Sequence, residues 1–141
     1  MDKLTITFTR PTCIVLYFLF ENYTDGFFKY ILNYTYGKDG LVKKSEEACN
    51  CIEEAVSEFL EALDSYVNHP LPYYYWNFCM EIDKWDRVVV FLRNLNFHTV
   101  ALLASTTHGE EVPFPVAQEY LDIVRAAYRK IILARENKVV E

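Results

Sequence analysis

The sequence predicts a mainly α-helical bundle with a short β-strand near the N-terminus. The 141 residues include only four Gly and five Pro, too few for the many turns of a β-sandwich or barrel. Hydrophobic residues make up 52% of the chain, enough for a core without metal or disulfide cross-links. Two long segments also carry the apolar spacing of amphipathic helices. We expect residues 1–141 to form a single globular domain; the alternative is an α+β fold with a small sheet from residues 4–36.

The N-terminal segment predicts a half-buried strand followed by a buried element. Residues 4–9 alternate apolar side chains with threonine, which places the apolar ones on a single face. Residues 13–20 are apolar on every side, but this run is too short for a membrane-spanning helix, which needs about 20 residues. Pro11 suits the first turn of a helix, so we favour a helix over a buried strand. The choice between helix and strand stays open for residues 13–36.

The clearest element is a helix from Ser45 to Val67. Ser45 is a suitable N-cap, and the segment Asn68-His69-Pro70 ends the pattern. At about 100° per residue, the apolar side chains occupy one half of the helical wheel. They are Ala48, Cys49, Cys51, Ile52, Ala55, Val56, Phe59, Leu60, Ala62, Leu63, Tyr66 and Val67. The acidic side chains occupy the other half, so one face should be buried and the other charged.

The remaining segments predict further helices and their connections. Residues 71–76 have the composition of an aromatic connector, and residues 83–94 carry helical apolar spacing. Residues 100–104 suit either a short buried helix or a strand. Residues 105–115 contain a glycine and two prolines and predict a loop. The last helix is expected over residues 116–136, with acidic residues early and basic residues late, the order that complements the helix dipole.

The net charge of the chain is concentrated on the helix over residues 45–67. The chain has 14 basic and 20 acidic residues, a net charge of −6. Between residues 46 and 64 there are seven acids and no Lys or Arg, while 14 basic and 13 acidic residues lie elsewhere. The seven acids are Glu46, Glu47, Glu53, Glu54, Glu58, Glu61 and Asp64. They extend over about 27 Å of helix, at 1.5 Å per residue.

This acidic row has three interpretations. The simplest is a solvated helix face, since acidic surfaces favour solubility. However, like charges one turn apart repel each other, so a cationic surface opposite them would explain the row better. That surface could belong to the last helix of the same chain, through Arg125, Arg129, Lys130 and Arg135. It could also belong to a basic protein partner, because a patch of one sign steers association.

Four consecutive aromatic residues, Tyr73, Tyr74, Tyr75 and Trp76, form a second unusual feature. One element cannot point all four inward, so some must lie at the surface or bridge elements. They could form the rim of a wide aromatic core or a contact patch, because Tyr and Trp are enriched at interfaces. No Lys or Arg lies within seven residues on either side, whereas a base-stacking platform normally has them nearby. We therefore expect no direct nucleic-acid binding.

The sequence contains no recognisable catalytic or metal-binding motif. The cysteines Cys13, Cys49, Cys51 and Cys79 are expected to be free thiols, because a chain of this size needs no disulfide cross-links. On a helix, Cys49 and Cys51 would point roughly 160° apart, so they cannot share a zinc ion. His69, His98 and His108 match no metal motif. We predict no catalytic residue, no metal and no cofactor.

Our working hypothesis is a non-enzymatic protein-interaction module of the inhibitor, immunity or accessory type. It would dock a basic partner, including a nucleic-acid-binding protein, through the acidic helix face and residues 73–76. One alternative is a small hydrolase or transferase that pairs Cys13 or Cys79 with a histidine, or uses His108 in the predicted loop. Another is a structural subunit of an assembly. We expect a cytoplasmic protein without a signal peptide or membrane contact, and the oligomeric state stays open.

Overall fold

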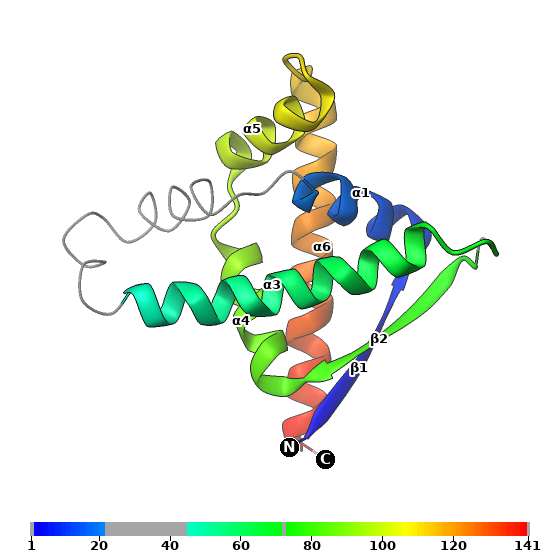
Figure 1. The fold of residues 1–141 in the computed structure, drawn as a ribbon, viewed down its shortest axis with the longest axis vertical. Coiled ribbons are helices and arrows are strands. Elements are labelled where there is room, and N and C mark those ends of the chain that lie inside the picture. Colours follow the sequence, from blue (N-terminus) through cyan, green and yellow to red (C-terminus); the bar gives the residue numbers. More distant parts are fainter. Residues whose placement is uncertain (1, 22–44, 72, 141) are drawn as a thin grey trace.

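The computed structural model describes residues 2–21, 45–71 and 73–140, with side chains described for all of these except residues 45–51, 107 and 138–140. The elements, in chain order, are β1 (Lys3–Thr9), α1 (Arg10–Phe20), α3 (Ser45–Val67), β2 (Tyr75–Glu81), α4 (Ile82–Arg93), α5 (Phe97–His108) and α6 (Phe114–Val140). Within the described ranges these are five helices and one two-stranded sheet (Figure 1). The predicted mainly α-helical fold with a short N-terminal strand is confirmed.

The sheet joins two strands that are far apart in the sequence. β1 and β2 are antiparallel, with Lys3 opposite Glu81 and Thr9 opposite Tyr75. Its inner face is buried and consists of Leu4, Ile6, Phe8, Phe78 and Met80. The strand predicted for residues 4–9 is confirmed, but the connector predicted for residues 71–76 is wrong at its end, where β2 begins. Residues 22–36 of the alternative small sheet lie outside the described residues.

Each strand runs directly into a helix. α1 begins at Arg10, immediately after β1, and α4 begins at Ile82, immediately after β2. When these two starting residues are aligned, both helices bury the same four positions. They are Cys13, Leu16, Leu19 and Phe20 in α1, and Trp85, Val88, Phe91 and Leu92 in α4, which buries Val89 as well. The two strand–helix units therefore share a burial pattern, and the helix favoured for residues 13–20 is confirmed.

The helices form layers around this core. α3 packs on α1 and α4, and both of these pack in turn on α6. In Figure 1, α3 runs across the view while α6 follows the long axis of the molecule. α1 and α4 therefore form a middle layer between α3 and α6. This layering decides which charged surfaces can meet within one chain.

α5 is longer than the sequence predicts. Its N-terminus carries a capping box, in which the Asn96 side chain accepts a hydrogen bond from the backbone N–H of Thr99 and the Thr99 side chain accepts from that of Asn96. The helix continues to His108 and ends at Gly109, whose φ of +76° suits the left-handed C-cap position. The loop predicted for residues 105–115 is therefore wrong at both ends, since residues 105–108 belong to α5 and α6 already begins at Phe114.

The core is rich in aromatic side chains, and Trp85 links several elements. Its ring is fully buried and lies 5.5 Å from the Phe59 ring of α3 and 6.4 Å from the Phe8 ring of β1. Its indole Nε1 donates a hydrogen bond of 2.7 Å to the Leu4 carbonyl. No single described helix is both long and apolar enough to cross a membrane, although α4 and the first part of α5 pass that test jointly, as a pair bent by 96°.

Candidate interaction surface

The α3 helix has one buried and one charged side, as predicted. Its buried residues are Ile52, Ala55, Val56, Phe59, Leu63 and Tyr66. On the opposite side, Glu54, Glu61 and Asp64 are exposed, and Glu58 is half-buried. We call these four residues the acidic face. Their placement follows from the helical period, which alternates apolar and acidic groups every three or four residues.

The other three predicted acids, Glu46, Glu47 and Glu53, are not part of the acidic face. Glu53 is half-buried and interacts with neighbouring groups, so it is not a free carboxylate. Glu46 and Glu47 belong to the first turn of α3, with side chains outside the described residues. The acidic face defined above therefore contains all the predicted acids that are exposed in the described part of α3.

The charge on the acidic face is partly matched within the chain, but not by the predicted helix. Glu58 forms an ion pair with Lys84 of α4, and its carboxylate raises the pKa of the Lys84 ammonium through a hydrogen bond. In contrast, Arg135 of α6 contacts Asp86 of α4, with 3.1 Å between Nε and Oδ1. For the four residues of the acidic face, the suggested match with the basic residues of the last helix is not found, because α1 and α4 lie between α3 and α6.

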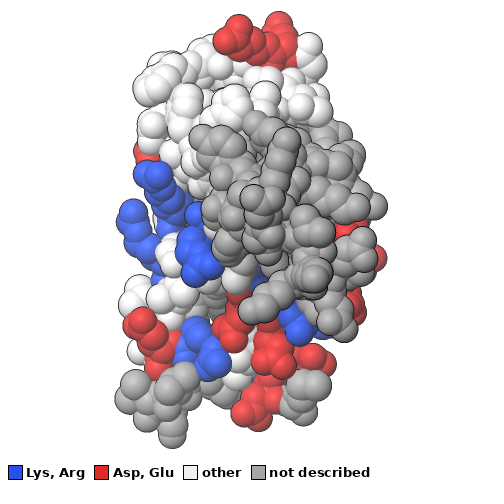
Figure 2. All heavy atoms as spheres, turned by 90° about the vertical axis from the view of Figure 1, so that its left-hand side faces the viewer, with Lys and Arg blue, Asp and Glu red and all other residues white. Residues whose placement is uncertain are grey.

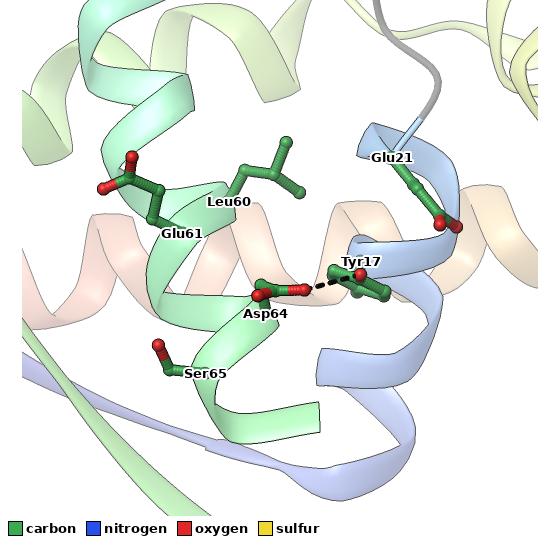
Figure 3. A pocket seen from close by; sticks show the side chains of 6 residues that line it. All are labelled: Tyr17, Glu21, Leu60, Glu61, Asp64 and Ser65. Carbon is green, nitrogen blue, oxygen red and sulfur yellow. Dashed lines mark hydrogen bonds between the residues drawn. The ribbon is translucent and has the colours of Figure 1, made fainter. Parts of the chain in front are cut away.

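A groove of about 450 Å³ opens between α1 and α3. Tyr17 and Asp64 point toward each other across it, and the Tyr17 hydroxyl donates a hydrogen bond of 2.7 Å to the Asp64 carboxylate (Figure 3). Leu60 points into the space between the two helices and adds an apolar wall. Glu21, at the end of α1, supplies a second carboxylate. The groove therefore combines acidic and apolar surface at one end of the acidic face.

Replacing Tyr17 with phenylalanine should lower the free energy of unfolding by about 0.5–1 kcal/mol at pH 7, a typical net value for one hydrogen bond. The bond to Asp64 raises the pKa of the Tyr17 hydroxyl above its usual value of 10.0. The stabilisation is therefore complete below about pH 10 and is lost as the pH rises through the higher folded-state pKa. Urea denaturation of both proteins at neutral and high pH measures this difference, which should shrink at high pH. A difference that stays constant would assign the effect to ring packing instead.

The aromatic segment divides into an inner and an outer part. Trp76 is half-buried and stacks on Tyr66, with ring centroids 5.0 Å apart. Tyr73, Tyr74 and Tyr75 are 47%, 54% and 64% exposed. We call these three residues the tyrosine patch. Trp76 therefore belongs to the rim of the aromatic core, one of the two predicted roles of this segment. The three tyrosines have the exposure that the other role, a contact patch, requires.

The tyrosine patch lies next to the C-terminal end of the acidic face. The Tyr66 hydroxyl donates a hydrogen bond to the Tyr73 carbonyl, which ties the chain after α3 back to the helix. Asn68 Nδ2 donates a 2.9 Å hydrogen bond to the Asp64 carboxylate at the same helix end. Figure 1 shows this end of α3 close to the start of β2. The structure thus brings the two predicted features together as neighbouring surfaces.

The thiols of Cys13 and Cys79 and the ring of His108 lie in three different settings. Cys13 is buried, and burial raises the pKa of its thiol from 9.0 to about 12, so it stays protonated and a poor nucleophile. Cys79 is exposed and faces Thr5 across the sheet. His108 lies at the end of α5, not in a loop, with its ring 4.6 Å from that of Phe18. Among the described residues, no group of three or more His, Cys, Asp or Glu could hold a metal ion.

A second groove, of about 540 Å³, lies between α5 and the start of α6 and was not predicted. Leu102 and Phe114 contribute exposed apolar surface there, at 37% and 66% exposure. His98 and Ser105 also line the groove, but on α5 they lie two turns apart, about 10 Å along the axis, too far for a direct hydrogen bond. The sequence could not indicate this groove, because the end of α5 resembled a loop.

Comparison with known proteins gives no match to any family model, curated protein or solved structure. Function must therefore be inferred from the surfaces described above.

Proposed function

We propose that this chain is a non-enzymatic protein-interaction module, of the inhibitor, immunity or accessory type, that acts in the cytoplasm. It binds a basic protein through the acidic face, with the tyrosine patch as an adjoining contact. The observation that carries the proposal is the exposure of Glu54 and Glu61, neither of which forms an ion pair with a described Lys or Arg. A basic partner would remove the repulsion between these carboxylates and gain a faster encounter from their common sign.

The two surfaces contribute differently to binding. Exposed carboxylates mainly raise the rate of association and select a basic partner. Tyrosines that become buried at the centre of an interface contribute most of the affinity. A nucleic-acid-binding protein is a suitable partner because an acidic ridge can occupy a basic channel in place of phosphates. The chain itself is not expected to bind nucleic acid directly.

Exchanging both exposed glutamates for lysine, as Glu54→Lys/Glu61→Lys, should weaken partner binding about tenfold or more, because two attractive charges become repulsive. The tagged chain is incubated with cell lysate at about 50 mM and about 500 mM salt, and captured basic proteins are identified and titrated. Glu58 is left unchanged, because its reversal would also break the ion pair with Lys84.

The matched control is Glu110→Lys/Glu119→Lys, which makes the same change in net charge at two exposed acids outside α3. It should leave partner binding within about twofold of the wild-type value, a change of under 0.5 kcal/mol. Circular dichroism confirms that both variants keep their helices. An equal loss of partner binding in both variants would show that binding depends on net charge alone. Undiminished binding in the α3 variant, or no salt-sensitive basic partner, would contradict the proposal.

A further inference from the structure

Three arginines form a second charged surface on the side of the molecule made by α4 and α6. Arg93 of α4 and both Arg125 and Arg129 of α6 are exposed. α4 and α6 run in opposite directions, and the contact between Arg135 and Asp86 aligns them. Counting the same number of residues along each helix places Arg93 level with the turn that carries Arg125 and Arg129. Figure 2 shows Lys and Arg side chains gathered along one edge of this view. We call these three residues the arginine face.

The arginine face has no partner in the described part of the chain. None of its guanidinium groups forms an ion pair or hydrogen bond with a described side chain. Asp122, one turn before Arg125, instead accepts a 3.0 Å hydrogen bond from Gln118. The neighbouring Lys130 does not extend this surface, since its ammonium lies 5.6 Å from the centre of the Phe8 ring. With respect to the described residues, the guanidinium donors therefore have no anionic partner, and their planar geometry suits a carboxylate surface.

We propose that the arginine face binds the acidic face of a second copy of this chain. The two surfaces carry opposite charges, and α1 and α4 separate them within one molecule, so they can meet only between molecules. Arg125 and Arg129 lie one helical turn apart, about 6 Å along the axis. Consecutive acids of the acidic face lie three or four residues apart, about 5–6 Å along the axis. The two rows of charge therefore match in spacing as well as in sign.

The groove between α1 and α3 gives one of these guanidinium groups a defined place. Asp64 of α3 and Glu21, which follows α1, supply carboxylates from two sides, and Leu60 supplies an apolar wall for the aliphatic part of an arginine side chain. The Tyr17 ring offers a surface on which a planar guanidinium can stack. On the other copy, Leu133 follows the arginines along α6 and is 59% exposed, so it adds apolar contact beside the charges.

This contact is heterologous, because it joins two different surfaces. Each copy keeps one free face of each kind, so association continues into chains or rings and does not stop at a dimer. The inference rests on the acidic face of the proposed function. Self-association would cover this face and compete with the basic partner, which makes binding of that partner dependent on the concentration of the chain itself.

The test uses two variants that each remove one face, Arg125→Gln/Arg129→Gln and Glu54→Gln/Glu61→Gln. At about 50 mM salt, sedimentation velocity of the wild type should show a mass that rises with concentration above the 16.6 kDa of one chain, and about 500 mM salt should restore the monomer. Each variant alone should stay monomeric. An equimolar mixture should form a complex of two chains and nothing larger, since each variant retains one intact face. Lys3→Gln/Lys130→Gln removes two cations outside the arginine face and should associate like the wild type.

Several results would overturn the inference. The inference is wrong if the wild-type chain stays monomeric at low salt. It is also wrong if Arg125→Gln/Arg129→Gln alone still associates, or if the equimolar mixture of the two variants remains monomeric. A labelled single-stranded oligonucleotide provides a further outcome. If the wild type binds it without self-associating, and Arg125→Gln/Arg129→Gln does not bind it, the arginine face binds nucleic acid instead. Binding of a nine-residue arginine peptide tests the acidic face of the proposed function independently of self-association. If the peptide still binds the wild type and not Glu54→Gln/Glu61→Gln, the acidic face binds cations even though the second copy does not use it.

Discussion

Replacing Trp85 with alanine should lower the free energy of unfolding by about 4 kcal/mol or more, a large part of the 5–15 kcal/mol typical of a small domain. Trp85 is fully buried, and its ring packs against Phe8 and Phe59, which belong to β1 and α3. The substitution leaves a cavity where the sheet, α3 and α4 meet, and it removes the hydrogen bond to the Leu4 carbonyl. Urea denaturation followed by circular dichroism measures the loss, because it does not depend on tryptophan fluorescence.

Two variants separate the contributions of Trp85. Trp85→Phe keeps an aromatic ring but not the indole donor, so it should lower the free energy of unfolding clearly less than Trp85→Ala does. About 1 kcal/mol of its effect should come from the lost hydrogen bond. Leu133→Ala, at a position 59% exposed on α6, should change stability by no more than about 0.5 kcal/mol. If Trp85→Ala lowered the free energy of unfolding as little as Leu133→Ala, Trp85 would not pack between α4, α3 and the sheet as described.

Replacing Tyr74 and Tyr75 with serine should weaken binding of the basic partner about 30-fold, which corresponds to the 2 kcal/mol typical of interface hot spots. Their rings pack edge to face, with centroids 4.8 Å apart, and project from the start of β2. This rigid, exposed pair can bury a large area at a small cost in side-chain entropy. Stability should fall by less than about 1 kcal/mol, because neither side chain belongs to the core. Titration of the captured partner against both proteins measures the effect.

Phe114→Ser is the control for this loss. Phe114 is 66% exposed, but it lies at the start of α6, beside the second groove. Its substitution should leave partner binding unchanged if the tyrosine patch is the contact. Similar losses in both variants would indicate a general dependence on exposed aromatic surface. Full binding by Tyr74→Ser/Tyr75→Ser would remove the patch from the proposed interface and leave only the acidic face.

The amphipathic helix was the most predictable element, because a local period decides it. The apolar stripe from Ile52 to Tyr66 marks the buried side without knowledge of any neighbour, and α3 has the predicted boundaries. The same period predicts the exposure of Glu54 and Glu61. Local periodicity therefore gives both the helix and the part of the candidate site that depends on only one helix.

The elements that depend on distant partners were not predictable in this way. Residues 75–81 alternate in burial, but they form a strand because β1 lies beside them, and nothing in their own sequence identifies that partner. The ion pair of Glu58 with Lys84 and the hydrogen bond between Tyr17 and Asp64 likewise join different helices. The groove and the opposed charged surfaces follow from such contacts, so they required the three-dimensional arrangement.

The pairing of β1 with β2 has a consequence for synthesis of the chain on the ribosome. Lys3 pairs with Glu81 and Thr9 with Tyr75, so β1 leaves the ribosome long before its partner strand is made. At the usual 5–20 residues per second, this interval is roughly 3–16 s. During it, the apolar side of the nascent β1 strand has no sheet to complete, which makes it a natural segment for a chaperone to bind. Pairing of the two strands should therefore wait until residue 81 has left the exit tunnel.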